Sequence, residues 1–181
     1  MQAIDVDGLR FEFDNTWRAL KWDDHPAYRE GGLNGHAGTK AIDIVALHRG
    51  DELWLIEGGS MRTAAARIRF KNKRAAKREP LHEEFAGKVR DTIAASAWVQ
   101  DRHDTAKDLI PYLRHAVRGS AGKVHAVLWF EGLEEAELMA MEDQVRQSLR
   151  WLNPQVRILN AEICKRHPQR DLVGVAVSNV P

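Results

Sequence analysis

Two short apolar runs, separated by a polar loop, constrain the fold of this chain more than any other feature. Residues 40–47 and 53–57 are rich in branched and aromatic side chains. The five residues between them, His48-Arg49-Gly50-Asp51-Glu52, form a polar segment of hairpin length. We therefore predict a β-hairpin whose two strands lie in the protein core.

Each strand of this hairpin carries one acidic residue, Asp43 in the first and Glu57 at the end of the second. Burying an unpaired carboxylate costs several kcal/mol, so each acid needs a cationic or metal partner. If the hairpin is centred on Gly50, the two residues face each other with Cβ atoms about 4.5–5.5 Å apart. Both could then bind one hard cation. A loop with an even number of residues would instead place them on opposite faces.

A purely structural interpretation of the two acids is also open. In that interpretation Asp43 pairs with Lys40 or with an arginine of the basic stretch described below, and Glu57 marks the exposed end of its strand. The metal-site interpretation requires the odd-length loop, so the hairpin register is the observation that decides between them.

The order of the other elements predicts one mixed α/β domain over residues 1–181. We expect an N-terminal hairpin within residues 1–14, with a type I′ turn at Asp7-Gly8, and a short helix from Trp17 towards Tyr28. An extended piece over 66–70 and a helix over 81–100 follow. A helix from Asp104 or Thr105 to Gly119, a strand over 123–130, an acidic amphipathic helix over 133–152 and strands over 155–163 and 172–180 complete the prediction.

Composition favours a globular protein in a reducing compartment. The 181 residues include 27 basic and 26 acidic side chains and are 44% hydrophobic. The single cysteine, Cys164, cannot form an internal disulfide or a cysteine-based zinc site. No apolar run approaches the roughly 20 residues of a membrane span, and acidic residues stand near the N-terminus where a signal peptide would be basic and apolar. We expect a cytoplasmic protein without a membrane partner.

Basic residues are concentrated in one segment. Residues 62–78 contain eight basic side chains and no acidic one, whereas the rest of the chain has an excess of acids. Such a block repels itself unless an anion lies against it, and a nucleic-acid backbone is one such anion. The alternative is a solvated loop, or a strand face neutralised by acidic helices of the same molecule. The side chains that we assign to nucleic-acid contact are Arg62, Arg67, Arg69, Lys71, Lys73 and Arg74.

The order of these features resembles the PD-(D/E)xK nuclease superfamily over roughly residues 16–130. The resemblance is carried by acids near residues 23–30, by the runs that contain Asp43 and Glu57, by the basic segment, and by Gly87-Lys88-Val89-Arg90-Asp91-Thr92 on a helix. It implies a restriction-endonuclease-like mixed β-sheet flanked by helices, with the C-terminal helix and strands of residues 133–181 added.

The same resemblance implies a function. It implies hydrolysis of nucleic-acid phosphodiesters, with DNA favoured over RNA, and Mg²⁺ or Mn²⁺ as the cofactor. It assigns Asp43 and Glu57 as metal ligands, with Asp24 or Glu30 completing the set. Since many nucleases cut duplexes as dimers, it also implies a homodimer or a subunit of a larger complex.

One position departs from the superfamily pattern. A lysine normally lies two residues after the glutamate, where it orients the attacking water and stabilises the transition state; this chain has Gly59 there. Lys88 on the predicted helix could supply the ammonium group instead, unless it only pairs with Asp91. Alternatively the metal alone activates water, or catalysis is lost and a nucleic-acid-binding or regulatory subunit remains. The catalytic candidates are Asp43, Glu57 and Lys88.

Overall fold

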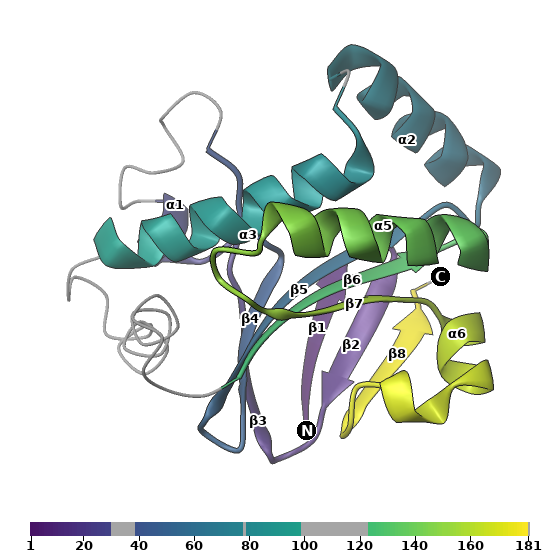
Figure 1. The fold of residues 1–181 in the computed structure, drawn as a ribbon. Helices are drawn as coiled ribbons and strands as arrows, with labels where there is room; N and C mark the ends of the chain where they lie inside the picture. Colours follow the sequence, from purple (N-terminus) through teal and green to yellow (C-terminus); the bar gives the residue numbers. More distant parts are fainter. Residues whose placement is uncertain (30–38, 78, 99–122, 181) are drawn as a thin grey trace.

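The computed structural model describes residues 1–29, 39–77, 79–98 and 123–180 as two β-sheets with helices around them (Figure 1). The larger sheet has the strand order β3-β4-β5-β6-β7 and the smaller sheet the order β1-β2-β8. The protein is therefore an α/β domain with one mixed and one antiparallel sheet, in agreement with the predicted fold class at this level.

The larger sheet consists of β3 (Trp17–Lys21), β4 (Ile44–His48), β5 (Glu52–Ser60), β6 (Val124–Glu131) and β7 (Gln155–Leu159). The first three strands are antiparallel, and β5, β6 and β7 are parallel. In the β4–β5 hairpin Ile44 pairs with Ile56 and His48 with Glu52. The hairpin is thus centred on Gly50, which has a φ of +82°, and the predicted odd-length loop is confirmed.

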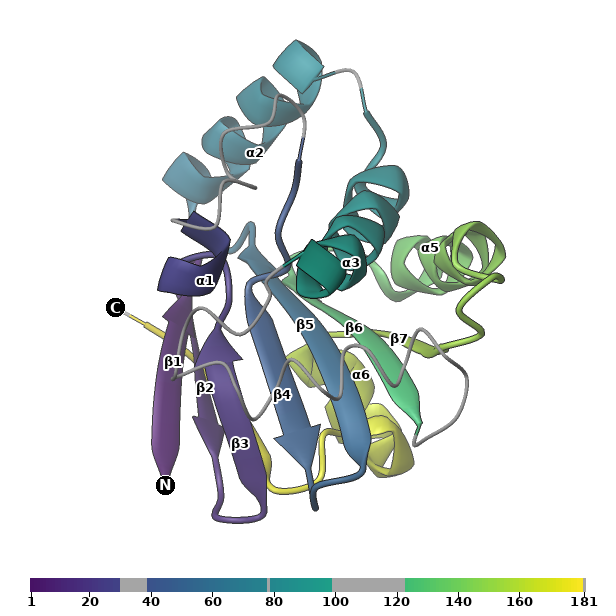
Figure 2. The same ribbon diagram turned by 90° about the vertical axis from the view of Figure 1, so that its left-hand side faces the viewer.

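Helices lie on both sides of this sheet (Figures 1 and 2). They are α1 (Pro26–Arg29), α2 (Ala64–Lys77), α3 (Leu81–Trp98), α5 (Glu135–Ser148), α6 (Ala161–Arg166) and the 3-10 helix η2 (Pro168–Arg170). The α3 helix confirms the sequence prediction for this segment, and its side chains Phe85, Val89 and Ile93 are buried at helical spacing. Figures 1 and 2 place α3 and α5 side by side over the sheet, with α2 projecting beyond it.

The smaller sheet packs against the face of the larger one that lies opposite α3 and α5 (Figures 1 and 2). Its strands are β1 (Gln2–Val6), β2 (Leu9–Phe13) and β8 (Val175–Asn179). Asp7 and Gly8 join β1 to β2 with φ values of +43° and +83°, as the predicted hairpin turn requires. A Cβ atom on Gly58 would lie 3.1 Å from Val6 Cγ1, so glycine at this position allows the two sheets to approach closely.

Three predictions of local structure are wrong. Residues 17–21 form β3 rather than a helix, because Trp17 and Ala19 alternate inward while the strand pairs with β4. Residues 66–70 belong to α2 rather than to a strand, because the segment continues for 14 residues rich in alanine, lysine and arginine, which favour helix. The strand predicted over 155–163 ends at Leu159, where Asn160 caps α6 through a 2.8 Å bond from Ile163 N–H. The helix predicted from Asp104 or Thr105 lies outside the described residues.

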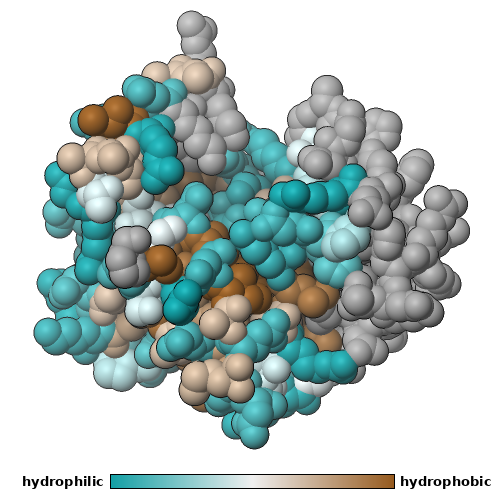
Figure 3. All heavy atoms as spheres, turned by 180° about the vertical axis from the view of Figure 1, so that it is seen from behind, coloured by the Kyte–Doolittle hydropathy of each residue, from teal (hydrophilic) through white to brown (hydrophobic). Residues whose placement is uncertain are grey.

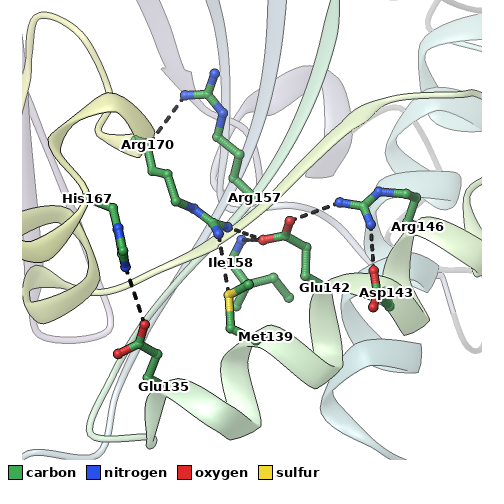
Figure 4. A network of polar contacts seen from close by, with 9 residues as sticks. All are labelled: Glu135, Met139, Glu142, Asp143, Arg146, Arg157, Ile158, His167 and Arg170. Atoms are coloured by element: carbon green, nitrogen blue, oxygen red, sulfur yellow. Dashed lines mark hydrogen bonds and ion pairs between the residues drawn. The ribbon is translucent and has the colours of Figure 1, made fainter.

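A buried carboxylate, Glu142, joins α5 to β7 and to η2 (Figure 4). Its Oε2 atom accepts a hydrogen bond from Arg170 and one of 3.2 Å from the Ile158 N–H. Its Oε1 atom accepts a 2.9 Å bond from Arg146. Because both oxygens are paired with cations or donors, the buried charge at Glu142 holds α5 in place against the edge of the sheet.

The surface seen from behind is mainly hydrophilic, with apolar side chains gathered in a band near its centre (Figure 3). Among the described helices, none combines the length and the hydropathy that crossing a lipid bilayer would require.

Candidate functional site

Two hydrogen bonds hold Asp43 in place directly before β4. The residue is buried, and its main-chain oxygen accepts a 2.7 Å hydrogen bond from the Trp22 N–H. Its side-chain Oδ2 accepts a 2.9 Å hydrogen bond from the Gly58 N–H of β5. These two bonds tie Asp43 to the strands on either side and leave Oδ1 for another partner.

Glu57 lies opposite Asp43, since the β4–β5 register continues by one residue beyond the Ile44–Ile56 pair. Lys88 reaches both acids from α3: its Nζ atom donates a hydrogen bond to Glu57 Oε1 and lies 3.7 Å from Asp43 Oδ1. The side chains of Asp43, Glu57 and Lys88 are only 10%, 15% and 15% exposed. The structure therefore brings the three predicted catalytic residues into one buried cluster.

The purely structural interpretation of the two acids does not describe this arrangement. Lys40 pairs with Glu79, at 2.6 Å to its Oε2 atom, and not with Asp43. Asp91 accepts a 3.0 Å bond from the Lys40 N–H and pairs with Arg90 rather than with Lys88. Glu57 is buried and does not stand at an exposed strand end. The cation that compensates the two carboxylates is Lys88.

The cluster holds more negative charge than Lys88 alone can neutralise. Burial raises the pKa of Asp43, against the influence of Lys88 and of the Gly58 N–H. Burial, followed by the negative charge of Asp43, raises the pKa of Glu57 well above its ordinary value. Burial lowers the pKa of Lys88, but Glu57 and Asp43 outweigh it, so the ammonium form is favoured.

One oxygen of this cluster has no donor. Glu57 Oε2 is buried and has no hydrogen-bond partner among the described residues. A proton on Glu57 would relieve the repulsion between its carboxyl group and the Asp43 carboxylate. The site is therefore built to take up either a proton or a second cation between Asp43 and Glu57.

A third acid near Asp43 is Asp23, which the sequence analysis did not select. Its side chain is half-buried, and its Oδ1 atom has no hydrogen-bond partner in the described part of the chain. Burial, followed by the charge of Asp43, raises the pKa of Asp23 to about 6. Had residues 17–21 been recognised as a strand paired with β4, the same register would have placed residues 22 and 23 beside Asp43.

Asp24, the predicted third ligand, has other partners. It forms ion pairs with Arg29 and, at 2.6 Å, with Lys21, and its side chain is 42% exposed. Lys21 and Arg29 lower the pKa of Asp24. Glu30, the other residue considered for this role, lies outside the described residues. Of the two neighbouring acids, Asp23 is therefore the one whose pKa the charge of Asp43 raises.

A cavity of about 250 Å³ lies beside Glu57, between β5, α2 and α3, and we call it the Glu57 cavity. Its apolar lining includes three phenylalanine rings and two leucines, and its polar lining includes a serine, an arginine and two further acids. The residues that line it are Asp7, Glu57, Gly58, Gly59, Ser60, Ala66, Arg69, Phe70, Leu81, Glu84, Phe85, Leu128 and Phe130.

The predicted nucleic-acid-binding residues divide into two groups. Arg69 lines the Glu57 cavity, and Lys71 is exposed on the same helix, to which Lys73 and Arg74 also belong. Arg62 and Arg67 point back to the protein: Arg62 lies 3.2 Å from Glu131 Oε2, and Arg67 donates a 2.9 Å bond to the Met61 carbonyl. The basic segment is thus partly neutralised within the molecule, while Arg69 and Lys71 remain available on α2.

Gly59, where the superfamily has its lysine, lies against an aromatic ring. A Cβ atom at this position would come within 2.6 and 2.8 Å of the Phe130 ring. That ring in turn packs against Phe70 of α2, with the centroids 5.1 Å apart. A side chain at residue 59 therefore requires Phe130 to move, and the ammonium group that contacts Glu57 beside Asp43 comes from Lys88 of α3.

Within residues 1–29, 39–77, 79–98 and 123–180, no cluster of three or more His, Cys, Asp or Glu side chains is arranged to hold a metal ion. Comparisons with protein-family models, with curated protein sequences and with solved structures found no match to this chain. The chemistry of the site itself therefore carries the functional argument.

Proposed function

We propose that this protein hydrolyses phosphodiester bonds of nucleic acids, with DNA favoured over RNA and Mg²⁺ or Mn²⁺ as its cofactor. The observation that carries the proposal is the contact of Lys88 with Glu57 beside Asp43, at a cavity that Arg69 also lines. The mixed sheet with α3 packed over the β4–β5 hairpin supports the restriction-endonuclease-like arrangement that the resemblance implies.

The oxygens of the cluster suit a hard divalent cation. Carboxylates are the ligands that Mg²⁺ prefers in proteins, and both Glu57 Oε2 and Asp23 Oδ1 are buried without a hydrogen-bond partner among the described residues. Asp43 and Glu57 would hold the ion, and the Asp23 carboxylate would add negative charge near Asp43 without completing a three-residue ligand cluster. Bound there, the ion would supply an activated water and neutralise charge on the phosphate.

The chain's own residues would carry out the remaining steps. Lys88 keeps its positive charge at neutral pH, so its Nζ atom can stabilise the negative charge that develops on the phosphate oxygens. Arg69 can hold a neighbouring phosphate, because guanidinium groups match phosphate geometry. The Gly58 N–H fixes the Asp43 carboxylate, so that its free oxygen keeps its position.

Cleavage assays with matched variants test this proposal. We expect purified protein to cut plasmid or oligonucleotide DNA in Mg²⁺ or Mn²⁺, and the isosteric change Asp43→Asn to lower the rate at least about 100-fold, as losses of electrostatic stabilisation commonly do. Lys88→Met should have a similar effect. Asp24→Asn is the control and should cut at the wild-type rate. Cleavage that persists in Asp43→Asn, or no cleavage with any substrate, would refute the catalytic role.

A second candidate function is favoured by the closed contact between Lys88 and Glu57. Because a proton competes for the same oxygens, the site could have lost its cation, leaving a nucleic-acid-binding or regulatory subunit with a nuclease-like fold. In that case DNA binding without cleavage should weaken steeply with salt, and Arg69→Ala with Lys71→Ala should reduce the salt slope by about two.

The proposal also includes a cellular compartment and an assembly state. The only cysteine, Cys164, is buried and free, which supports a reducing compartment such as the cytoplasm. The homodimer or larger complex implied by the resemblance predicts a mass above 20.5 kDa in light scattering.

A further inference from the structure

We propose that the Glu57 cavity receives a single unpaired nucleobase, so that the substrate is single-stranded or locally unpaired nucleic acid. This inference rests on the proposed function and names the substrate class of the same site. It is carried by the lining, the size and the position of the cavity.

The lining of the cavity matches the chemistry of a base. Phe70 and Phe130 pack at a tilt of 59°, and Phe85 contributes a third ring. Aromatic side chains are the surfaces on which unpaired bases stack, and they accept any base because every base has a π-face. Ser60 and Arg69 add hydrogen-bonding groups to the same cavity, as the polar edge of a base requires.

The size of the cavity limits what can enter. Its volume of about 250 Å³ is below the roughly 300–1,000 Å³ of pockets for drug-sized ligands. One base fits such a space, whereas a base pair with its two backbones does not. A base can occupy the cavity only after it has left its partner, or from a strand that has none.

The position of the cavity connects it to the candidate chemistry. Glu57 belongs both to the cluster with Lys88 and to the cavity lining, and Arg69 reaches the same cavity from α2. The cavity wall therefore supplies Arg69 for the phosphate of a bound nucleotide, and Glu57 connects the cavity to Lys88. Gly59 allows the Phe130 ring to stand in the cavity wall, since any Cβ there would press on that ring. The glycine that replaces the superfamily lysine thus forms part of the base site.

The test compares strands with and without bases, using the full chain without divalent cations so that no cleavage occurs. Fluorescence anisotropy would measure the Kd for a fluorescein-labelled ten-residue thymidine strand and for a strand of equal length made of abasic sugar-phosphate units. We expect the thymidine strand to bind about tenfold more tightly. This comparison requires no variant, so a folding defect cannot obscure it.

A matched pair of variants then locates the base. Ala66 is buried and lines the cavity, so Ala66→Leu should fill it and abolish the preference for the thymidine strand. Ala65 is exposed on the same helix, so Ala65→Leu should keep the preference. Circular dichroism would show that both variants retain their helices.

Two outcomes separate this inference from the proposed function. Equal, salt-dependent binding of both strands by the wild-type protein would overturn the base site and leave phosphate binding intact. A preference that survives in folded Ala66→Leu would also overturn it. Failure to bind either strand would overturn the proposed nucleic-acid function, and the base site with it.

Discussion

Replacing Lys88 with methionine would remove the only cation that contacts the Asp43–Glu57 pair among the described residues. Methionine keeps the length and apolar character of the lysine stem, so the change removes mainly the charge. Breaking a buried ion pair by deleting one partner typically costs about 3–5 kcal/mol. With both carboxylates 15% exposed or less, we expect a loss in this range at pH 8. That is a large part of the 5–15 kcal/mol by which domains are usually stable.

The loss of stability in Lys88→Met should depend on pH in a defined direction. Burial raises the pKa values of Asp43 and Glu57. A carboxyl group whose pKa is higher in the folded state destabilises the protein above that pKa, and the cost disappears as the pH falls and a proton binds. Without Lys88 its opposition to this rise is lost, so Glu57 takes up its proton at a higher pH. The destabilisation should therefore be largest at pH 8 and should shrink towards pH 5.

Urea denaturation followed by tryptophan fluorescence at pH 8 and pH 5 would measure the effect. The double variant Glu57→Gln with Lys88→Met removes one buried charge as well and should recover part of the loss. Lys71→Met, an exposed lysine on α2, is the control and should change stability by less than about 0.5 kcal/mol. A loss below about 1 kcal/mol at pH 8, or equal losses at both pH values, would refute the reasoning.

Three further predictions concern other parts of the fold. Burial lowers the pKa of His125 to about 4. The contribution of His125 to the free energy of unfolding should therefore fall by at most about 3 kcal/mol as the pH drops from 6.5 to 4. His125→Phe should remove this loss, and urea denaturation curves that change equally with pH in both proteins would contradict the prediction. Gly59→Lys should cost about 1–3 kcal/mol by displacing Phe130 and should not raise nuclease activity; a stable, faster variant would show that residue 59 has room. Glu142→Gln should lower stability by about 2 kcal/mol in thermal melts, whereas the exposed Asp143→Asn should have little effect; similar losses would show that burial of Glu142 is unimportant.

The part of the site that local rules determine could be predicted from the sequence. The β4–β5 register follows from an odd polar loop with glycine at its centre, and this register alone places Asp43 opposite Glu57. Lys88 could be selected because a helix that follows a hairpin often packs over it, and α3 has a clear apolar stripe. Each of these inferences needs only neighbouring residues or one helix face.

The part of the site that depends on tertiary context could not be predicted from the sequence. Residues 17–21 form a strand only because β4 offers an edge to pair with, so Asp23 was overlooked beside Asp43. The segment with Arg67 and Arg69 alternates apolar and basic side chains, which is compatible with a strand over five residues and with a helix over fourteen. Since α2 forms one wall of the Glu57 cavity, the cavity could not be predicted either.

The pairing of β2 with β8 has a consequence for how the molecule is made. Leu9 lies beside Asn179 and Phe13 beside Val175. During synthesis, β2 therefore cannot form this pairing until β8 has left the ribosome. Until then the β1–β2 hairpin presents an unpaired edge, the kind of surface on which nascent chains associate wrongly. The smaller sheet, which packs against Gly58, can therefore be completed only after β4 and β5 have been synthesised.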